Sequence, residues 1–109
     1  MMTIDMVCGM VGGIEPHELE HWIHQRWVLP DSGDSGYLFH DFDVARVRLI
    51  VELKHDLAID EEAMPVLLNL LDQVYTLRRR MKALAAAIEA LPEESRQALR
   101  ARLNDERGE

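Results

Sequence analysis

The fold is decided by residues 3–27, which read TIDMVCGMVGGIEPHELEHWIHQRW. Thr3 is a suitable N-cap for a first helix over residues 3–11, where apolar residues recur at helical spacing. The Gly12-Gly13 pair ends this helix, because glycine readily adopts turn conformations that other residues avoid. Pro16 suits the first turn of a second helix over residues 16–27. Two short helices joined by a glycine-containing turn predict a helix-turn-helix.

A hairpin and a third helix are predicted next. Residues 28–30 and 37–39 flank a turn-rich stretch, and this arrangement predicts a small β-hairpin wing. Asp41 is the expected N-cap of a helix over residues 42–57. Its apolar residues fall into two stripes, one of Phe42, Leu49, Ile50, Leu53 and Leu57 and the other of Val44, Val47 and Val51. One stripe can pack on the first two helices, and the second then needs another partner, in this chain or a different one.

The clearest periodicity lies in a last long helix, which starts near Asp60 or at Pro65. Both core positions of four heptads are apolar, with Leu67, Val74, Met81 and Ile88 at a and Leu70, Leu77, Leu84 and Leu91 at d. This pattern predicts a coiled coil that forms a homodimer, and the alternative is a helix packed inside one domain. We therefore divide the chain into a winged helix-turn-helix (1–58), a coiled-coil dimerisation helix (59–91) and a charged C-terminal tail (92–109) with a weak helical pattern. The fold class is mainly α.

Negative charge is concentrated in the N-terminal part. The 109 residues hold 12 Lys+Arg and 20 Asp+Glu, a formal net charge of −8. Residues 1–45 hold eight acidic residues and one basic residue, Arg26, a net of −7, and the remaining residues have a net of −1. Well-studied repressors neutralise roughly 6–10 DNA phosphates, a task for which this module has one arginine. DNA binding is therefore not expected, and the charge favours a basic protein partner.

Few residues suggest chemistry. His17, His21 and His24 share one helix face beside Glu20, and histidines at i and i+4 can chelate a metal, but an exposed polar face explains them more simply. The single cysteine, Cys8, suits a small core residue and excludes an intrachain disulfide. No phosphate-binding loop or catalytic constellation is present, so we expect no enzyme, cofactor or metal. No segment is long and apolar enough to cross a membrane, and we expect a cytoplasmic protein.

The order of these elements resembles the MerR-type winged helix-turn-helix and, more specifically, the CbpM family of chaperone modulators. The resemblance rests on IEPHEL (14–19), WVLP (27–30), FDVARVR (42–48), KHDLAID (54–60) and LNLLDQV (68–74). It covers about residues 3–90. Two departures from typical MerR regulators are evident: the wing and second helix lack basic residues, and the coiled-coil region lacks a cysteine for thiolate metal sensing.

The resemblance implies that the chain binds the J-domain of a DnaJ-like co-chaperone of the CbpA type. By this binding the chain would inhibit the action of the co-chaperone on Hsp70. The alternative is a MerR-family DNA-binding transcriptional regulator that uses Arg46, Arg48 or the arginine-rich face of the last helix. For the first reading, the expected partner-binding residues are Glu18, Glu20, Arg48, Glu52, His55, Asp56 and Asp72. Each could instead be an ordinary solvated charge or part of an intrahelical pair such as Arg48 with Glu52.

Overall fold

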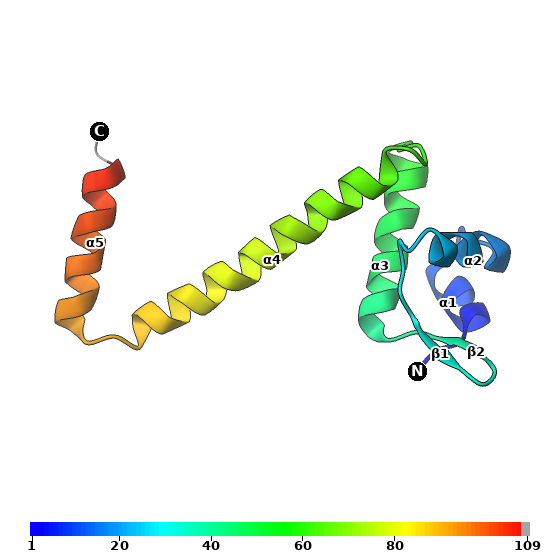
Figure 1. The fold of residues 1–109 in the computed structure, drawn as a ribbon, viewed down its shortest axis with the longest axis horizontal. Coiled ribbons are helices and arrows are strands. Elements are labelled where there is room, and N and C mark those ends of the chain that lie inside the picture. Colours follow the sequence, from blue (N-terminus) through cyan, green and yellow to red (C-terminus); the bar gives the residue numbers. More distant parts are fainter. Residues whose placement is uncertain (108–109) are drawn as a thin grey trace. The chain divides into compact units, whose positions relative to one another are not determined.

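The computed structural model describes the backbone of residues 1–107 as two units. The helix-turn-helix unit, Met1–Leu68, contains α1 (Ile4–Val11), α2 (Pro16–His24), β1 (Asp31–Gly33), β2 (Gly36–Leu38), α3 (Asp41–Val51), the π-helical turn η1 (Glu52–Asp56) and the start of α4 (Met64–Glu89) (Figure 1). The C-terminal unit, Asn69–Glu109, contains the rest of α4 and α5 (Glu93–Arg107). The predicted fold class, mainly α with a small hairpin wing and a long C-terminal helix, is confirmed.

The first two helices form as their local signals predict. The Thr3 hydroxyl caps α1 by accepting a hydrogen bond of 3.4 Å from the Met6 amide. Gly12 has φ = 75°, a left-handed conformation that favours glycine, and α2 begins at Pro16. The second helix ends at His24, three residues earlier than predicted, because the chain enters a left-handed conformation at Arg26 (φ = 65°). The Trp27 ring then lies 6.3 Å from that of Trp22.

One hydrophobic core holds the helix-turn-helix unit together. The α1 helix contacts both α2 and α3. The largest fully buried side chains come from α1, α2, α3, the start of α4 and the segments around the hairpin: Trp22, Phe39, Leu19, Ile50, Met64, Val7, Val28 and Val47. Fully burying one such side chain contributes about 1.5–3 kcal/mol relative to exposure. The core therefore fixes the surface that α2 and α3 present to solvent.

The hairpin is shorter than predicted: its first strand lies three residues further along the chain, and its second strand begins one residue earlier, at Gly36. The first strand is Asp31–Gly33 rather than residues 28–30, and it pairs antiparallel with β2, with Ser32 opposite Tyr37. Pro30 has no N–H group for a strand ladder, and Val28 is needed in the core. Gly36, at φ = 120°, allows the tight turn that brings the two strands together. A short bridge between Met2 and Phe39 ties the N-terminus to the end of this hairpin.

The third helix differs from the prediction in its cap and in its buried stripe. Its N-cap is His40, whose amide donates to Asp43 Oδ2 at 2.9 Å, whereas Asp41 is the first helical residue. The stripe predicted to run from Phe42 to Leu57 is wrong at both ends, because these side chains are 70% and 65% exposed. The residues that pack inward are Val44, Val47, Ile50 and Leu53, which mix the two predicted stripes.

The connection from α3 to α4 contains a second left-handed residue, Ala58, with φ = 52°. Asp60 follows, and its carboxylate accepts a hydrogen bond of 2.8 Å from the Ala63 amide. The long helix α4 then begins at Met64, between the two predicted starts, and Met64 and Leu68 are buried in the core of the unit. This connection fixes the first turn of α4 to the helix-turn-helix.

Replacing Ala58 with glycine is expected to stabilise the unit. An L-residue in the left-handed region costs roughly 1–2 kcal/mol, which glycine avoids, although glycine also gains more freedom on unfolding. We expect a net gain of about 0.5–1 kcal/mol. Urea unfolding of Ala58→Gly measures it. The same change inside a helix, Ala45→Gly, is expected to lower stability by about 1 kcal/mol. A loss of stability in Ala58→Gly would contradict the prediction.

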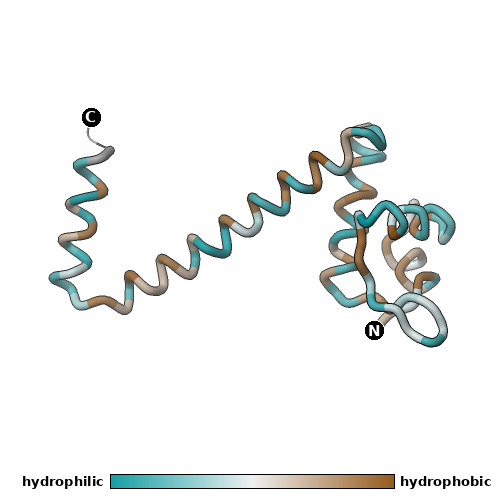
Figure 2. Tube along the Cα trace, viewed as in Figure 1, coloured by the Kyte–Doolittle hydropathy of each residue, from teal (hydrophilic) through white to brown (hydrophobic). Residues whose placement is uncertain are grey.

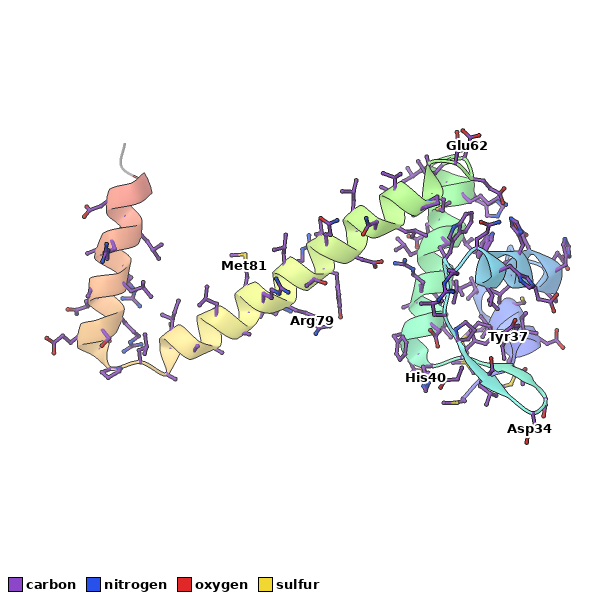
Figure 3. All side chains as sticks on the ribbon, in the orientation of Figure 1. Asp34, Tyr37, His40, Glu62, Arg79 and Met81 are labelled. Carbon is purple, nitrogen blue, oxygen red and sulfur yellow. The ribbon has the colours of Figure 1, made fainter. Side chains whose placement is uncertain are left out.

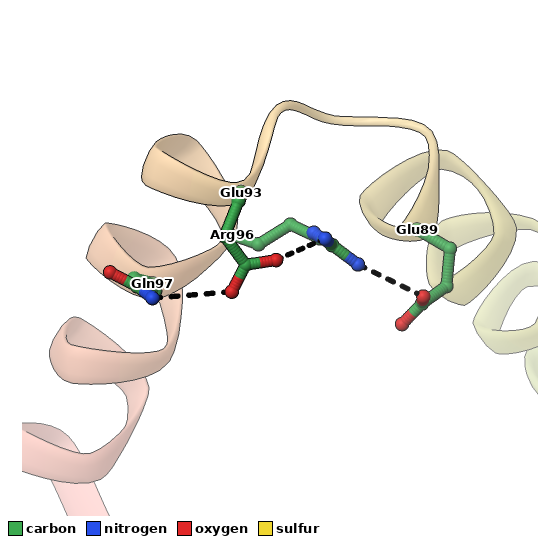
Figure 4. Close-up of polar contacts among 4 residues, drawn as sticks. All are labelled: Glu89, Glu93, Arg96 and Gln97. Carbon is green, nitrogen blue, oxygen red and sulfur yellow. Dashed lines mark hydrogen bonds and ion pairs between the residues drawn. The ribbon is translucent and has the colours of Figure 1, made fainter.

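In the C-terminal unit, α4 ends at Glu89 and α5 begins at Glu93. The predicted d-position residue Leu91 therefore lies in the turn before Pro92 rather than in the helix. Arg96 joins the two helices by binding Glu89, with Nη1 to Oε2 at 3.3 Å, and Glu93 (Figure 4). The weak helical pattern predicted for the tail corresponds to α5, and residues 108–109 of that tail lie outside the described residues.

Along α4 hydrophobic and hydrophilic residues alternate (Figure 2). The a and d residues of the predicted heptads that belong to the C-terminal unit are mostly exposed: Leu70, Val74, Leu77, Met81 and Leu84. Met81 and Arg79 point to opposite sides of the helix, as an apolar seam with a charged outer face requires (Figure 3).

Candidate functional site: the acidic surface of the helix-turn-helix unit

The surface of the helix-turn-helix unit carries most of the negative charge. Six of the eight acidic residues among residues 1–45 are exposed: Asp5, Glu15, Glu20, Asp31, Asp34 and Asp41. Asp34 lies at the tip of the hairpin and points into solvent (Figure 3). Of the other two, Asp43 is buried in the first turn of α3 and Glu18 is half-buried. Among the exposed residues, Glu20 lies on α2 and Asp31 and Asp34 lie in the hairpin, so both elements present carboxylates to solvent.

An ion pair joins α2 to η1. Lys54 Nζ lies 3.0 Å from Glu18 Oε2 and 5.8 Å from the centre of the Trp22 ring. Burial alone would raise the pKa of the Glu18 carboxyl, but the hydrogen bond and the charge of Lys54 outweigh it and lower the pKa. Glu18 is one of the predicted partner-binding residues, and its half-buried carboxylate is bound by Lys54, 36 residues away in the sequence.

The Glu18–Lys54 pair predicts a pH dependence of stability. Since the folded-state pKa of Glu18 is lowered, its contribution is complete above the unfolded value of about 4.3 and is lost as the pH falls through the folded value. We expect Glu18→Gln to cost about 0.5–1 kcal/mol at pH 7, because the pair is partly solvated. The free-energy difference from the wild type should shrink progressively as the pH falls through the folded pKa of Glu18. Urea unfolding at a series of pH values from 7 downwards measures it, and the exposed Glu20→Gln serves as the control. A difference that persists in acid would contradict the assignment.

Two histidines pair with carboxylates of other segments. His21 Nε2 lies 2.6 Å from Glu61 Oε1 and joins α2 to the segment before α4. His40 Nε2 lies 2.8 Å from Asp31 Oδ2 and joins the start of α3 to β1. Among the residues with described side chains, no group of three or more His, Cys, Asp or Glu could hold a metal ion. His17 and His24, the other histidines of α2, belong to no such group.

Cys8 is part of the core. Its side chain is buried on α1. Burial raises the pKa of the thiol, and the carboxylates of Asp5, Glu15 and Glu18 raise it further. The thiolate, which is the reactive form, is therefore disfavoured, as expected for a packing residue.

The remaining predicted partner-binding residues fall into two groups. Glu20 is exposed on α2, whereas Arg48, Glu52, His55 and Asp56 are exposed on α3 and η1. Asp72 belongs to the C-terminal unit, where it lines an open hollow along α4. The structure thus brings four of these residues together on one helical segment. Two apolar residues outside the predicted site, Leu29 and Phe42, are also exposed in this unit. Spacing places Phe42 in an apolar stripe of the third helix, whereas no sequence pattern singles out Leu29.

Basic residues gather on α4 in the C-terminal unit. Arg78, Arg79, Arg80 and Lys82 are all exposed, and Arg79 Cζ lies 5.8 Å from the centre of the Tyr75 ring. No helix in the described part of the chain is long and apolar enough to cross a membrane.

Comparison with known proteins agrees with the architecture. No curated protein and no solved structure matches the chain. The family model described as MerR HTH family regulatory protein matches residues 2–86, which cover all of the helix-turn-helix unit except Met1 and most of α4. The chain therefore belongs to the MerR helix-turn-helix family of regulatory proteins.

Proposed function

We propose that the chain is a chaperone modulator of the CbpM type. In this role it binds the J-domain of a DnaJ-like co-chaperone and inhibits the action of that co-chaperone on Hsp70. Membership of a regulatory family favours a non-enzymatic regulator. The specific proposal is further supported by the five sequence stretches that resemble the CbpM family.

The observation that carries the proposal is the charge of the helix-turn-helix unit. Residues 1–45 have a net charge of −7, six of their acidic side chains are exposed, and their only base is Arg26. DNA phosphates would be repelled by such a surface, whereas a basic polypeptide would be steered towards it. The helix-turn-helix architecture then serves as a scaffold for binding protein.

The proposed binding residues are the exposed ones of α2, α3 and η1. Glu20, Glu52 and Asp56 would supply carboxylates, and the exposed Arg48 and His55 would supply polar contacts of the opposite kind. Glu18, which is bound to Lys54, belongs to the same proposed set. Asp72 of the C-terminal unit is proposed separately as a further partner-binding residue. We further propose that the protein is a homodimer through the heptads of α4 and acts in the cytoplasm, where its proposed partners act.

Calorimetric titration against the cognate J-domain tests this function. We expect binding at 50 mM salt that weakens several-fold at 300 mM, because exposed charges are screened over about 6–14 Å in this range. The double variant Glu52→Lys/Asp56→Lys should weaken binding at least tenfold. Its control, Glu94→Lys/Asp105→Lys, makes the same change of net charge on exposed residues of α5 and should bind as the wild type does.

A steady-state assay of the Hsp70 ATPase and a gel shift at low salt complete the test. The chain should suppress the J-domain-stimulated ATPase and should give no specific DNA complex. Failure to bind the J-domain would overturn the proposal. A specific DNA complex together with that failure would favour a DNA-binding regulator instead.

A further inference from the structure

The outward face of α3 carries apolar residues that lie largely outside the core. A spacing of i, i+3 and i+7 places three of these residues on one side of the helix: Phe42, Ala45 and Leu49. Glu52, at i+10, continues the same side. Phe42 and Ala45 are exposed, and Leu49 is half-buried. The opposite side of the helix faces the core, so this face cannot turn inward to bury its apolar surface.

The segment that contains Leu29 is held to α3 and to its N-cap by two contacts, and we infer from them that Leu29 lies beside this face. On one side of Leu29, Arg46 Nε donates to the Trp27 carbonyl oxygen at 3.0 Å. On the other side, Asp31 is bound by His40, whose ring stacks on Phe42 with centroids 5.0 Å apart and planes at 10°. Leu29 is nevertheless 64% exposed between these contacts. A fixed backbone that presents exposed apolar side chains is typical of an interaction surface.

Acidic residues border these side chains. Asp31 and Asp41 lie at the hairpin end and Glu52 at the other end, all exposed, and Arg48 is the exposed base of the same helix. A complementary partner therefore has an apolar stripe flanked by cations, which is the composition of a basic amphipathic helix.

We propose that the α3 docking face, formed by Leu29, Phe42, Ala45 and Leu49, binds a basic amphipathic helix of the partner protein. This inference rests on the proposed function and adds to it the site and the structural element of the partner. The carboxylates steer and orient the helix, whereas the apolar residues supply most of the affinity.

Two variants of the full chain test the surface by titration with the J-domain. Leu29→Ser/Phe42→Ser removes the apolar anchors, and Ala45→Lys places bulk and a like charge in the middle of the face. We expect each variant to weaken binding at least tenfold. The double variant should weaken binding by a similar factor at 50 and at 300 mM salt, because salt does not screen apolar contacts. The control Met6→Ser/Met10→Ser removes two exposed apolar residues from α1 and should bind within twofold of the wild type.

The outcomes separate the two proposals. Wild-type binding that the double variant and Ala45→Lys both retain would overturn the docking face but leave the chaperone-modulator function standing. Absence of wild-type binding to the J-domain would overturn that function.

In that case a designed helical peptide of leucine and lysine probes the docking face itself. Binding of this peptide by the wild type and not by the double variant would support the docking face, whereas no binding by the wild type would overturn it. A double variant that sediments as a monomer while the wild type is a dimer would assign the face to a second copy and overturn the inference.

Discussion

Replacement of Trp22 by alanine is expected to destabilise the helix-turn-helix unit by about 3–5 kcal/mol. Trp22 is fully buried on α2, its ring lies 6.3 Å from that of Trp27, and Lys54 Nζ lies 5.8 Å from its centre. Alanine would leave a cavity at the junction of these groups and remove the contact with the lysine. Since small domains are stable by about 5–15 kcal/mol, most or all of the margin would be lost.

The control for this prediction is Trp22→Phe. The indole Nε1 of Trp22 is buried and donates no hydrogen bond among the described residues, so phenylalanine removes no hydrogen bond and leaves a smaller cavity. We expect it to cost less than half as much as alanine. Urea unfolding followed by far-UV circular dichroism, with Trp27 as a fluorescent reporter, measures both variants. A cost below about 1 kcal/mol for Trp22→Ala would contradict the central role of this residue.

Local signals were sufficient to predict the helix-turn-helix. Thr3, Gly12 and Pro16 each act on the backbone within one turn of helix, so their effect does not depend on the rest of the chain. The end of α2 was less predictable, because the apolar residue Trp27 extends the helical pattern while Arg26 already leaves the helix. When an apolar residue in the turn after a helix packs into the core, the helical spacing of apolar residues continues past the true end of the helix. A prediction from this spacing alone is then too long.

Packing decided which apolar residues of α3 were buried, and the sequence could not show this. Phe42 belongs to an apolar stripe by spacing, yet it lies one residue after the helix start and stacks on His40 in solvent. At the other end, η1 has a π-helical turn, which changes the rotation per residue and leaves Leu57 exposed. A constant 100° per residue therefore assigns the wrong faces at both ends of this segment.

The candidate site was predictable in charge but not in its contacts. The count of acidic residues in residues 1–45 required no structure, and neither did the lack of bases for binding phosphates. The Glu18–Lys54 pair could not be predicted, because its members lie on separate elements whose packing depends on the core. Leu29 could not be recognised as exposed for the same reason, since its neighbour Val28 is equally apolar and is buried.

Charged residues in the apolar seam of α4 are expected to convert the proposed dimer to a monomer. Leu77 and Leu84 are d-position residues with exposed fractions of 57% and 59% in the single chain. Burying each against a second copy contributes about 1.5–3 kcal/mol, and two glutamates per chain replace that gain with the cost of desolvating carboxylates. The C-terminal unit would also lose helicity, because an isolated helix without a packed face is only marginally stable in water.

Sedimentation equilibrium at 5–50 µM and far-UV circular dichroism test Leu77→Glu/Leu84→Glu against a control of equal charge. The control, Thr76→Glu/Ala83→Glu, changes exposed residues at c positions, one residue before each seam position. These side chains lie outside the seam, so the control should remain a dimer with wild-type helicity. A wild type that sediments as a monomer throughout this range would contradict the coiled coil. Equal dissociation of both variants would show that added charge, rather than loss of the apolar seam, breaks the association.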